Sequence, residues 1–155
     1  MRTRFELLAA ALGITLVAAT TASGSPSLTR PGTIRITDRE VKHLHVDGCA
    51  PGKGAGDQDF YRQLLFNKRI TPNAIGHSDI VCTNTGTGST SCTGTYFLPR
   101  GKIMVGGVIS FGSEPLSKFM LPLTGGTGKY DNARGYVNVR QLYGGRTNLD
   151  FHVLP

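Results

Sequence analysis

Apolar and polar residues alternate along much of the chain after residue 32, and this two-residue period is typical of β-strands that bury one face. The segments Tyr136–Leu142 and Asn148–Leu154 alternate cleanly, and there is almost no helical signal. The pattern predicts about eight strands, which cover residues 33–46, 59–67, 75–85, 92–98, 102–111, 118–123, 136–142 and 148–154.

Some of these predicted strands are irregular. The alternation changes phase near Asp38–Glu40, which predicts a β-bulge. Gly106-Gly107 would let its strand bend sharply or let another backbone approach. Segment 59–67 is aromatic-rich, and a short helix is the alternative there. Eight antiparallel strands with short glycine-rich turns can close into a barrel just wide enough for a small ligand. The predicted fold class is therefore all-β, a single eight-stranded antiparallel barrel.

The first 24 residues have the order of a secretory signal peptide. Arg2 and Arg4 precede an apolar run, Leu7–Ala19, and small residues follow it. That run of about 13 residues is too short to span a bilayer comfortably, and the alternatives are a buried helix or a retained anchor. We therefore expect a signal peptide at 1–24, a linker at 25–32 and one domain at 33–155, secreted and without stable membrane insertion after processing.

Composition narrows the possible functions only slightly. Hydrophobic residues make up 39% and charged residues 17% of the 155 residues, which suits one folded domain and excludes a disordered chain. The formal net charge is +7, and it remains positive after removal of the leader. Lysine and arginine are scattered singly, and no basic stretch is interleaved with stacking aromatic residues. We therefore expect no nucleic-acid partner.

Cys82 and Cys92 flank a turn rich in glycine, serine and threonine, between two segments that read as paired strands. We expect these two cysteines to form a disulfide that closes a small loop in an oxidising compartment. Cys49 is left over, and it is either buried or a free thiol able to join two chains. No Cys-x-x-Cys spacing indicates zinc.

The segment Pro122–Val139 is the most specific part of the chain. Its GGTGKY run, Gly125–Tyr130, is followed by Ala133-Arg134-Gly135-Tyr136, and together they resemble a segment of the dirigent and allene oxide cyclase-like barrels. Asp57-x-Asp59-Phe60 and the cysteine hairpin are similar to the bacterial secreted branch of that superfamily. The resemblance implies an eight-stranded barrel with a hydrophobic lumen that cyclises a small molecule or guides its stereochemistry, and it implies a homo-dimer or homo-trimer.

The glycine-rich motif itself has a mainly architectural interpretation. Gly125, Gly126 and Gly128 would allow left-handed backbone angles in a tight turn. Tyr130 would plug the barrel end, and Arg134 would hydrogen-bond loop carbonyl groups. The motif is not a phosphate-binding loop, because no serine or threonine follows Lys129.

The chain departs from the plant members at the positions that carry their chemistry. The region Pro99–Phe111 has no aspartate, and Glu40 and Glu114 are the only glutamates after the leader. Neither plant mechanism can be transferred residue by residue.

Asp59 and Tyr61 are the first catalytic candidates, because they are two residues apart and share one face of a strand. A carboxyl group beside a phenol in an apolar lumen would have a shifted pKa and could protonate or orient a substrate. The alternative is a turn residue at the strand start and a plug at the barrel end. Phe60, on the opposite face, is a candidate binding residue.

Tyr136 is the third catalytic candidate, and Arg140 and His152 are candidate binding residues. Tyr136, Asn138 and Arg140 share one face and Val137 and Val139 the other, so an apolar lumen would put the polar set in solvent.

Three pairs of side chains could act in acid–base chemistry, although each pair could equally be a surface feature. They are Asp150 with His152, His77 with Asp79, and His43 with His45. A metal site at His43 and His45 lacks an evident third ligand in the sequence, so no metal and no cofactor are expected.

The preferred functional hypothesis is a secreted barrel that binds a small apolar metabolite in its lumen and guides its cyclisation or stereochemistry, without a cofactor. Rate or selectivity would come from orientation and exclusion of water. The alternatives are a non-catalytic carrier and a structural, envelope-associated barrel that is filled by side chains.

Overall fold

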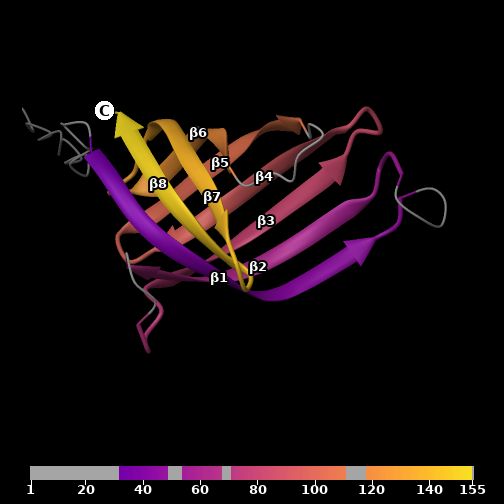
Figure 1. Cartoon of the computed structure of the whole chain (residues 1–155). Helices are drawn as coiled ribbons and strands as arrows, with labels where there is room; N and C mark the ends of the chain where they lie inside the picture. The colour runs from indigo at the N-terminus through magenta and orange to yellow at the C-terminus, as the bar shows by residue number, and fades with distance from the viewer. Residues whose placement is uncertain (1–31, 49–53, 68–70, 111–117, 155) are drawn as a thin grey trace, which may run out of the picture.

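The computed structural model describes residues 32–48, 54–67, 71–110 and 118–154, which form one closed antiparallel β-barrel (Figure 1). Each strand pairs with the next along the chain, and β1 pairs with β8 to close the barrel. The strands are β1 (Gly32–Val46), β2 (Gln58–Asn67), β3 (Gly76–Asn84), β4 (Ser89–Leu98), β5 (Gly101–Ser110), β6 (Lys118–Gly128), β7 (Arg134–Leu142) and β8 (Arg146–Leu154).

The predicted all-β, eight-stranded antiparallel barrel is confirmed. Segment 59–67, for which a short helix was the alternative, lies in strand β2. No helix in the described part of the chain is long and apolar enough to cross a membrane. The predicted signal peptide at 1–24, most of the predicted linker and Cys49 lie outside the described residues, and β1 already begins at Gly32.

The predicted bulge lies in β1, slightly after the expected position. Glu40 pairs with Gln63 and Lys42 with Arg62, so Val41 has no partner on β2. The residues from Ile36 to Arg39 pair with both β2 and β8, whereas the last residues of β1, from Lys42 to Val46, pair with β2 alone. β1 therefore curves and continues past the end of β8, as the indigo ribbon in Figure 1 shows.

The strand register places one residue in two toward the barrel interior, and most buried residues follow this rule. Thr37 and Phe66, which oppose each other, are buried at outward positions. A continuous apolar core fills the half of the interior formed by β5–β8. Its members include Ile103, Val105, Leu121, Leu123, Val137, Val139, Leu149, Phe151 and Val153. The apolar residues that alternate with polar ones in the sequence are the residues that are buried here, because the interior excludes water.

The glycine-rich motif is a strand rather than the loop that the sequence suggested. Gly126 and Gly128 belong to β6 and pair with Ile103 and Gly101 of β5. A Cβ atom at Gly126 would overlap the carbonyl oxygen of Tyr130 and lie 2.8 Å from that of Lys102. Gly126 is therefore needed for close approach of the backbones, whereas Gly128, with a φ of 63°, is needed for its left-handed conformation.

The connection from β6 to β7 closes one end of the barrel, hereafter the closed end. Tyr130 and Ala133 are buried there and pack into the core. The amide of Ala133 donates a hydrogen bond to the carbonyl oxygen of Tyr130, at 3.0 Å. Arg134 is exposed as the first residue of β7.

The opposite end, hereafter the mouth, is formed where β1 leads into β2 and where β3 turns into β4. The predicted disulfide is present there and joins directly opposed Cys82 and Cys92, whose Cα atoms are 4.0 Å apart. Inward-facing side chains near the mouth, such as Tyr61, Ile80 and Cys82, are only partly buried, in contrast to those at the closed end.

Candidate functional site

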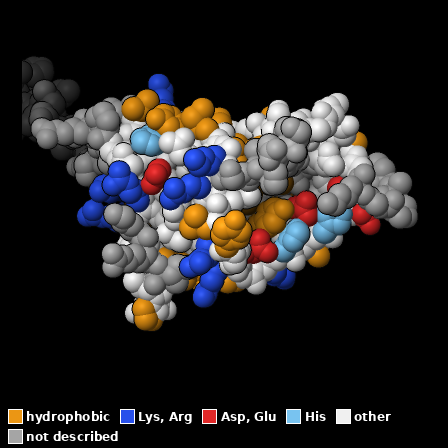
Figure 2. Space-filling view, viewed as in Figure 1, with side chains coloured by type: hydrophobic (Ala, Val, Ile, Leu, Met, Phe, Trp, Pro, Cys, Tyr) orange, Lys and Arg blue, Asp and Glu red, His pale blue; other side chains and the backbone are white. Residues whose placement is uncertain are grey.

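One side of the barrel interior carries polar side chains, and we call this set the polar wall. Strand register places its members on the inner face of β1, β2 and β3, from the middle of the barrel to the mouth. The polar wall consists of Asp38, Glu40, His43, His45, Asp59, Tyr61, Gln63 and Ser78. Figure 2 shows acidic and histidine side chains beside apolar ones at the mouth. An apolar barrel with one polar side can bind an apolar molecule and present ionisable groups to it.

Asp38 is the deepest ionisable member of the polar wall, with 1% of its surface exposed. It shares the inner face of β1 with Ile36, and it lies opposite Leu65 of β2 and Thr147 of β8. Burial raises the pKa of the Asp38 carboxyl to about 7, against the lowering effect of hydrogen bonds from Thr147. A carboxyl group with this pKa can both give and accept a proton near neutral pH.

One oxygen of Asp38 is not satisfied. No described group hydrogen-bonds its Oδ1 atom, although this atom is buried. A buried polar atom without a partner is rare and costs free energy, so it calls for an explanation. A ligand that brings a hydrogen-bond donor into the barrel would satisfy it.

Tyr96 of β4 is fully buried, and it interacts electrostatically with Asp38. Burial raises the pKa of the Tyr96 hydroxyl, and the negative charge of Asp38 adds to this rise. Its ring packs edge-on against Phe151, with centroids 4.9 Å apart. Tyr96 therefore remains a neutral phenol next to the buried carboxyl group.

Asp59 joins two histidines at the mouth. Its Oδ1 atom lies 2.8 Å from His43 Nε2 and 2.9 Å from His45 Nδ1. Burial tends to raise the pKa of Asp59, but the hydrogen bonds from His43 and His45 outweigh it and lower this pKa. The hydrogen bond to Asp59 raises the pKa of His45 in return. The cluster therefore favours a carboxylate at Asp59 and the protonated form of the His45 ring.

Tyr61 lies between this cluster and Gln63 on the inner face of β2. Its ring stacks on the ring of His43. Burial raises the pKa of the half-buried Tyr61 hydroxyl, and the charge of Asp59 contributes to this rise. The structure thus brings Asp59 and Tyr61 together on the inner face, as the sequence predicted, and their catalytic role stays a prediction.

The other predicted site residues face away from the interior. Phe60 of β2, Tyr136 and Arg140 of β7 and His152 of β8 occupy outward register positions, whereas Val137 and Val139 face the core. Tyr136 stacks on His152 with ring centroids 4.6 Å apart. The alternation in the sequence did not show which face of β7 lines the interior. In the structure the apolar face does, so Tyr136 and Arg140 face outward.

The remaining polar pairs also have partners outside the interior. Asp79 accepts two hydrogen bonds from Arg62, at 2.7 and 3.0 Å. His77 stacks on Phe97, with ring centroids 4.4 Å apart. Asp150 lies 3.7 Å from Arg35. These pairs belong to the outer surface and not to the polar wall.

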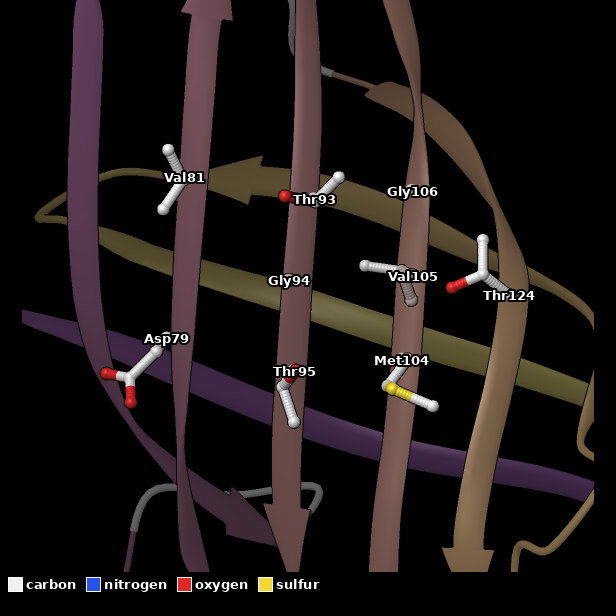
Figure 3. Close-up of a pocket in the computed structure, with 9 residues that line it drawn as sticks. All are labelled: Asp79, Val81, Thr93, Gly94, Thr95, Met104, Val105, Gly106 and Thr124. Carbon is white, nitrogen blue, oxygen red and sulfur yellow. The ribbon is translucent and has the colours of Figure 1, made fainter.

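Two depressions lie on the outer surface. One, of about 340 Å³, crosses β3–β6 where Gly106 lacks a side chain, and Figure 3 shows Asp79 and Met104 beside it. The other, of about 270 Å³, includes Arg140 together with Arg35 and Asp150. Arg140 therefore contributes to an outer depression and not to the interior.

The structure supplies possible cation ligands that the sequence did not reveal. One ligand atom each of His45, Asp47 and Asp57 lies within 4.8 Å of the others. His45 Nε2 is 3.3 Å from Asp47 Oδ1, and Asp57 accepts hydrogen bonds from the amides of Gly48 and Gly54. One imidazole and two carboxylates can hold a divalent cation such as Zn²⁺ or Mn²⁺.

Asp38 and Tyr96 were not among the predicted site residues. A signal for Asp38 was present, because it is two residues after Ile36 and four after Ile34, in phase with the buried face. No local signal identified Tyr96, since its approach to Asp38 depends on closure of the barrel.

The sequence matches no family model and no curated protein. Solved structures do match. A pyocyanin demethylase superposes with a TM-score of 0.68 at 22% identity, over 79% of this chain and 100% of that chain. The pterocarpan synthase dirigent protein GePTS1 superposes with a TM-score of 0.62 at 12% identity, over 80% of this chain and 83% of its own.

The chain has a dirigent-like barrel fold. The Diels Alderase AbmU from Streptomyces koyangensis is similar too, with a TM-score of 0.62 at 18% identity over 81% of this chain and 65% of that chain. The resemblance read from the GGTG and ARG segments agrees with these superpositions. Solved barrels of this shape thus include proteins with quite different activities, so function has to be argued from the polar wall.

Proposed function

We propose that this dirigent-like barrel binds a small, largely apolar molecule in its interior and guides its cyclisation or stereochemistry. The observation that carries the proposal is Asp38, a buried carboxyl group with a pKa of about 7 and one oxygen without a partner, in an otherwise apolar interior. Burial of an unpaired carboxyl group lowers the stability of the fold, so a purely structural role does not account for it.

Asp38 would act as a proton carrier. Its protonated form would give a proton to the bound molecule, and its carboxylate would take a proton from another position of the same molecule. The net reaction is then an isomerisation, which consumes no oxidant or reductant. Tyr61 and Asp59 would orient the molecule near the mouth, and the apolar core would exclude water.

The solved neighbours support this proposal at the level of the class of reaction. These neighbours include a pterocarpan synthase dirigent protein and a cyclase that catalyses a [4 + 2] cycloaddition. A barrel of this shape can therefore accommodate a reacting small molecule.

A filled, structural barrel is the second candidate, because the large side chains of Leu65, Tyr96 and Phe151 are fully buried in the interior. It accounts for the core of β5–β8, but it gives no reason for the orphaned oxygen of Asp38. A non-catalytic carrier would bind the same molecule and release it unchanged.

We further propose that the protein acts outside the cytoplasm. The signal-like sequence at 1–24 and the Cys82–Cys92 disulfide support this localisation. Fractionation of the producing cells, followed by detection of the processed chain, would test it. A chain found intact in the cytoplasm would overturn it.

Native mass spectrometry of the protein, isolated gently from the cells that make it, tests the proposed function. We expect a co-purifying small molecule, and we expect the isolated molecule to be converted on return to fresh protein. Asp38→Asn should bind it with at least about a hundredfold slower conversion, whereas Asp150→Asn on the outer face should convert it normally. Binding without conversion would identify a carrier, and no bound molecule, with no uptake of neutral acridine, would favour the filled barrel.

A further inference from the structure

Lysine and arginine within the described strands are confined to the outer face of the barrel, whereas carboxyl groups lie on both faces. By register, every lysine and arginine within the described strands occupies an outward position. They are Arg35, Arg39, Lys42, Arg62, Lys102, Lys118, Arg134, Arg140 and Arg146. The inner face of the same strands carries carboxyl groups instead, at Asp38, Glu40 and Asp59. A protein with a net charge of +7 thus surrounds an acidic interior.

The three inner carboxyl groups differ in what they can offer a ligand. Asp59 already accepts hydrogen bonds from His43 and His45. Glu40 is exposed near the bulge of β1. Asp38 is buried and leaves Oδ1 without a donor. A molecule that enters the barrel therefore meets an acceptor that lacks a partner. The described strands place no lysine or arginine on the inner face, and the histidines there, His43 and His45, are already hydrogen-bonded to Asp59.

Aromatic rings lie on the same route. The stacked pair of His43 and Tyr61 lies near the mouth, and Tyr96 lies beside Asp38. Aromatic faces attract cations and pack well against flat rings. The rest of the interior is aliphatic, through residues such as Ile103 and Val137. These surroundings fit an apolar ring system better than a flexible polar chain.

This inference rests on the proposed function and names its ligand class. We propose that the interior binds an apolar ring system that carries a positively charged or N–H-donating nitrogen, which hydrogen-bonds Asp38 Oδ1, and that it excludes carboxylates and sulfonates. The electrostatic attraction is strong because the acceptor is buried away from water. Molecules of the same size but negative charge meet Asp38 and Glu40, while the inward histidines are already hydrogen-bonded to Asp59.

Four three-ring probes of similar size separate charge from hydrogen bonding. They are 9-aminoacridinium (a cation with N–H donors), 10-methylacridinium (a cation without them), neutral acridine and anthracene-9-carboxylate. Their affinities are measured by fluorescence titration of the full chain at physiological salt, where weak attraction to exposed charges is largely screened. We expect 9-aminoacridinium to bind tightest, at least about tenfold tighter than acridine, and the carboxylate to bind weakest.

Asp38→Asn removes the charge with little change in shape, and it should reduce the preference for 9-aminoacridinium over acridine about tenfold. Asp150→Asn, the same change on the outer face, is the matched control and should leave the preference unchanged. Glu40→Gln provides a second inner variant if Asp38→Asn does not fold, and a smaller loss is expected because Glu40 is exposed.

The outcomes distinguish this inference from the proposed function. If all neutral and charged probes fail to bind, the lumenal binding site itself is refuted. If acridine or the carboxylate binds as tightly as 9-aminoacridinium, or if Asp38→Asn and Asp150→Asn behave alike, binding in the interior stands and the cationic ligand class is refuted. Equal binding of the two cations would retain the charge and eliminate the hydrogen bond to Oδ1.

Discussion

His43 and Tyr61 stack face to face across the β1–β2 pair, with ring centroids 4.6 Å apart and planes inclined by 13°. Directly opposed residues of an antiparallel pair are the unit by which neighbouring strands stabilise each other. This stack holds the ring of Tyr61 on the inner face, where the charge of Asp59 acts on its hydroxyl group. It therefore links the stability of the mouth to the position of a candidate catalytic group.

Two substitutions of Tyr61 should separate these two contributions. Tyr61→Phe keeps the stacked ring, so its free energy of unfolding in urea should stay within about 0.5 kcal/mol of the wild-type value. Tyr61→Ala should lose about 2 kcal/mol, since the ring is half-buried. Conversion of the co-purified ligand should fall in both variants. Tyr136→Phe, on the outer face, is the control, and equal conversion by Tyr61→Phe and Tyr136→Phe would exclude the Tyr61 hydroxyl from the reaction.

Asp38 should make the protein less stable as pH rises. Its pKa is about 7 in the folded protein and about 3.8 in the unfolded chain, so the folded state binds the extra proton between these pH values. Its contribution is fully present below about pH 4 and is lost as pH rises to about 7, by on the order of 4 kcal/mol. The charge of Glu40 adds to the rise in the pKa of Asp38, and Asp38 in turn raises the pKa of Tyr96.

Urea unfolding of wild type and Asp38→Asn across this pH range measures the effect, because other titrating groups cancel in the difference. The variant should gain stability relative to wild type as pH increases. A difference that does not change with pH would mean that the pKa of Asp38 is ordinary in the folded protein.

Reduction of the Cys82–Cys92 disulfide should destabilise the mouth. The bond spans 10 residues, and the loss in the chain-entropy model is about 3 kcal/mol. Replacement of both cysteines by serine should lower the free energy of unfolding by a similar amount and remove the response to reductant. Cys49→Ser is the control, and a loss of stability on reduction that persists without Cys82 and Cys92 would contradict the assignment.

Gly126→Ala should be strongly destabilising, by 3 kcal/mol or more as a rough guide to severe strain. Its Cβ would overlap the carbonyl oxygen of Tyr130, where the backbones of β6 and the β6–β7 connection meet. Gly32→Ala is the matched control, because a Cβ there has no described atom within 4 Å. Equal thermal unfolding temperatures for the two variants would contradict a tightly packed closed end.

The fold could be predicted from the sequence because most strands of the barrel pair with the next strand along the chain. Strands, turns and the Cys82–Cys92 bond join neighbours in sequence, so alternation and turn residues carry the information. The GGTG run was misassigned to a loop because glycine is common in turns, whereas Gly126 is required here by a close backbone approach within a strand.

The site was harder to predict because its members meet only in the closed barrel. Asp59 and Tyr61 could be paired from their spacing, but the face that they occupy depends on which side is buried. Asp38 and Tyr96 come from β1 and β4, and no local pattern relates them. Asp47 and Asp57 approach His45 only through the turn of the chain between β1 and β2.

Closure of the barrel by the β1–β8 ladder also sets the order in which the molecule can fold. All other pairs join consecutive strands, whereas this ladder joins residues such as Gly32 and Val153 from opposite ends of the domain. Local hairpins form early, and contacts distant in sequence form late and slowly. The nascent chain thus remains an open sheet with two free edges until β8 leaves the ribosome, and an open sheet edge can pair with other chains. Chaperone protection during synthesis matters most in that interval.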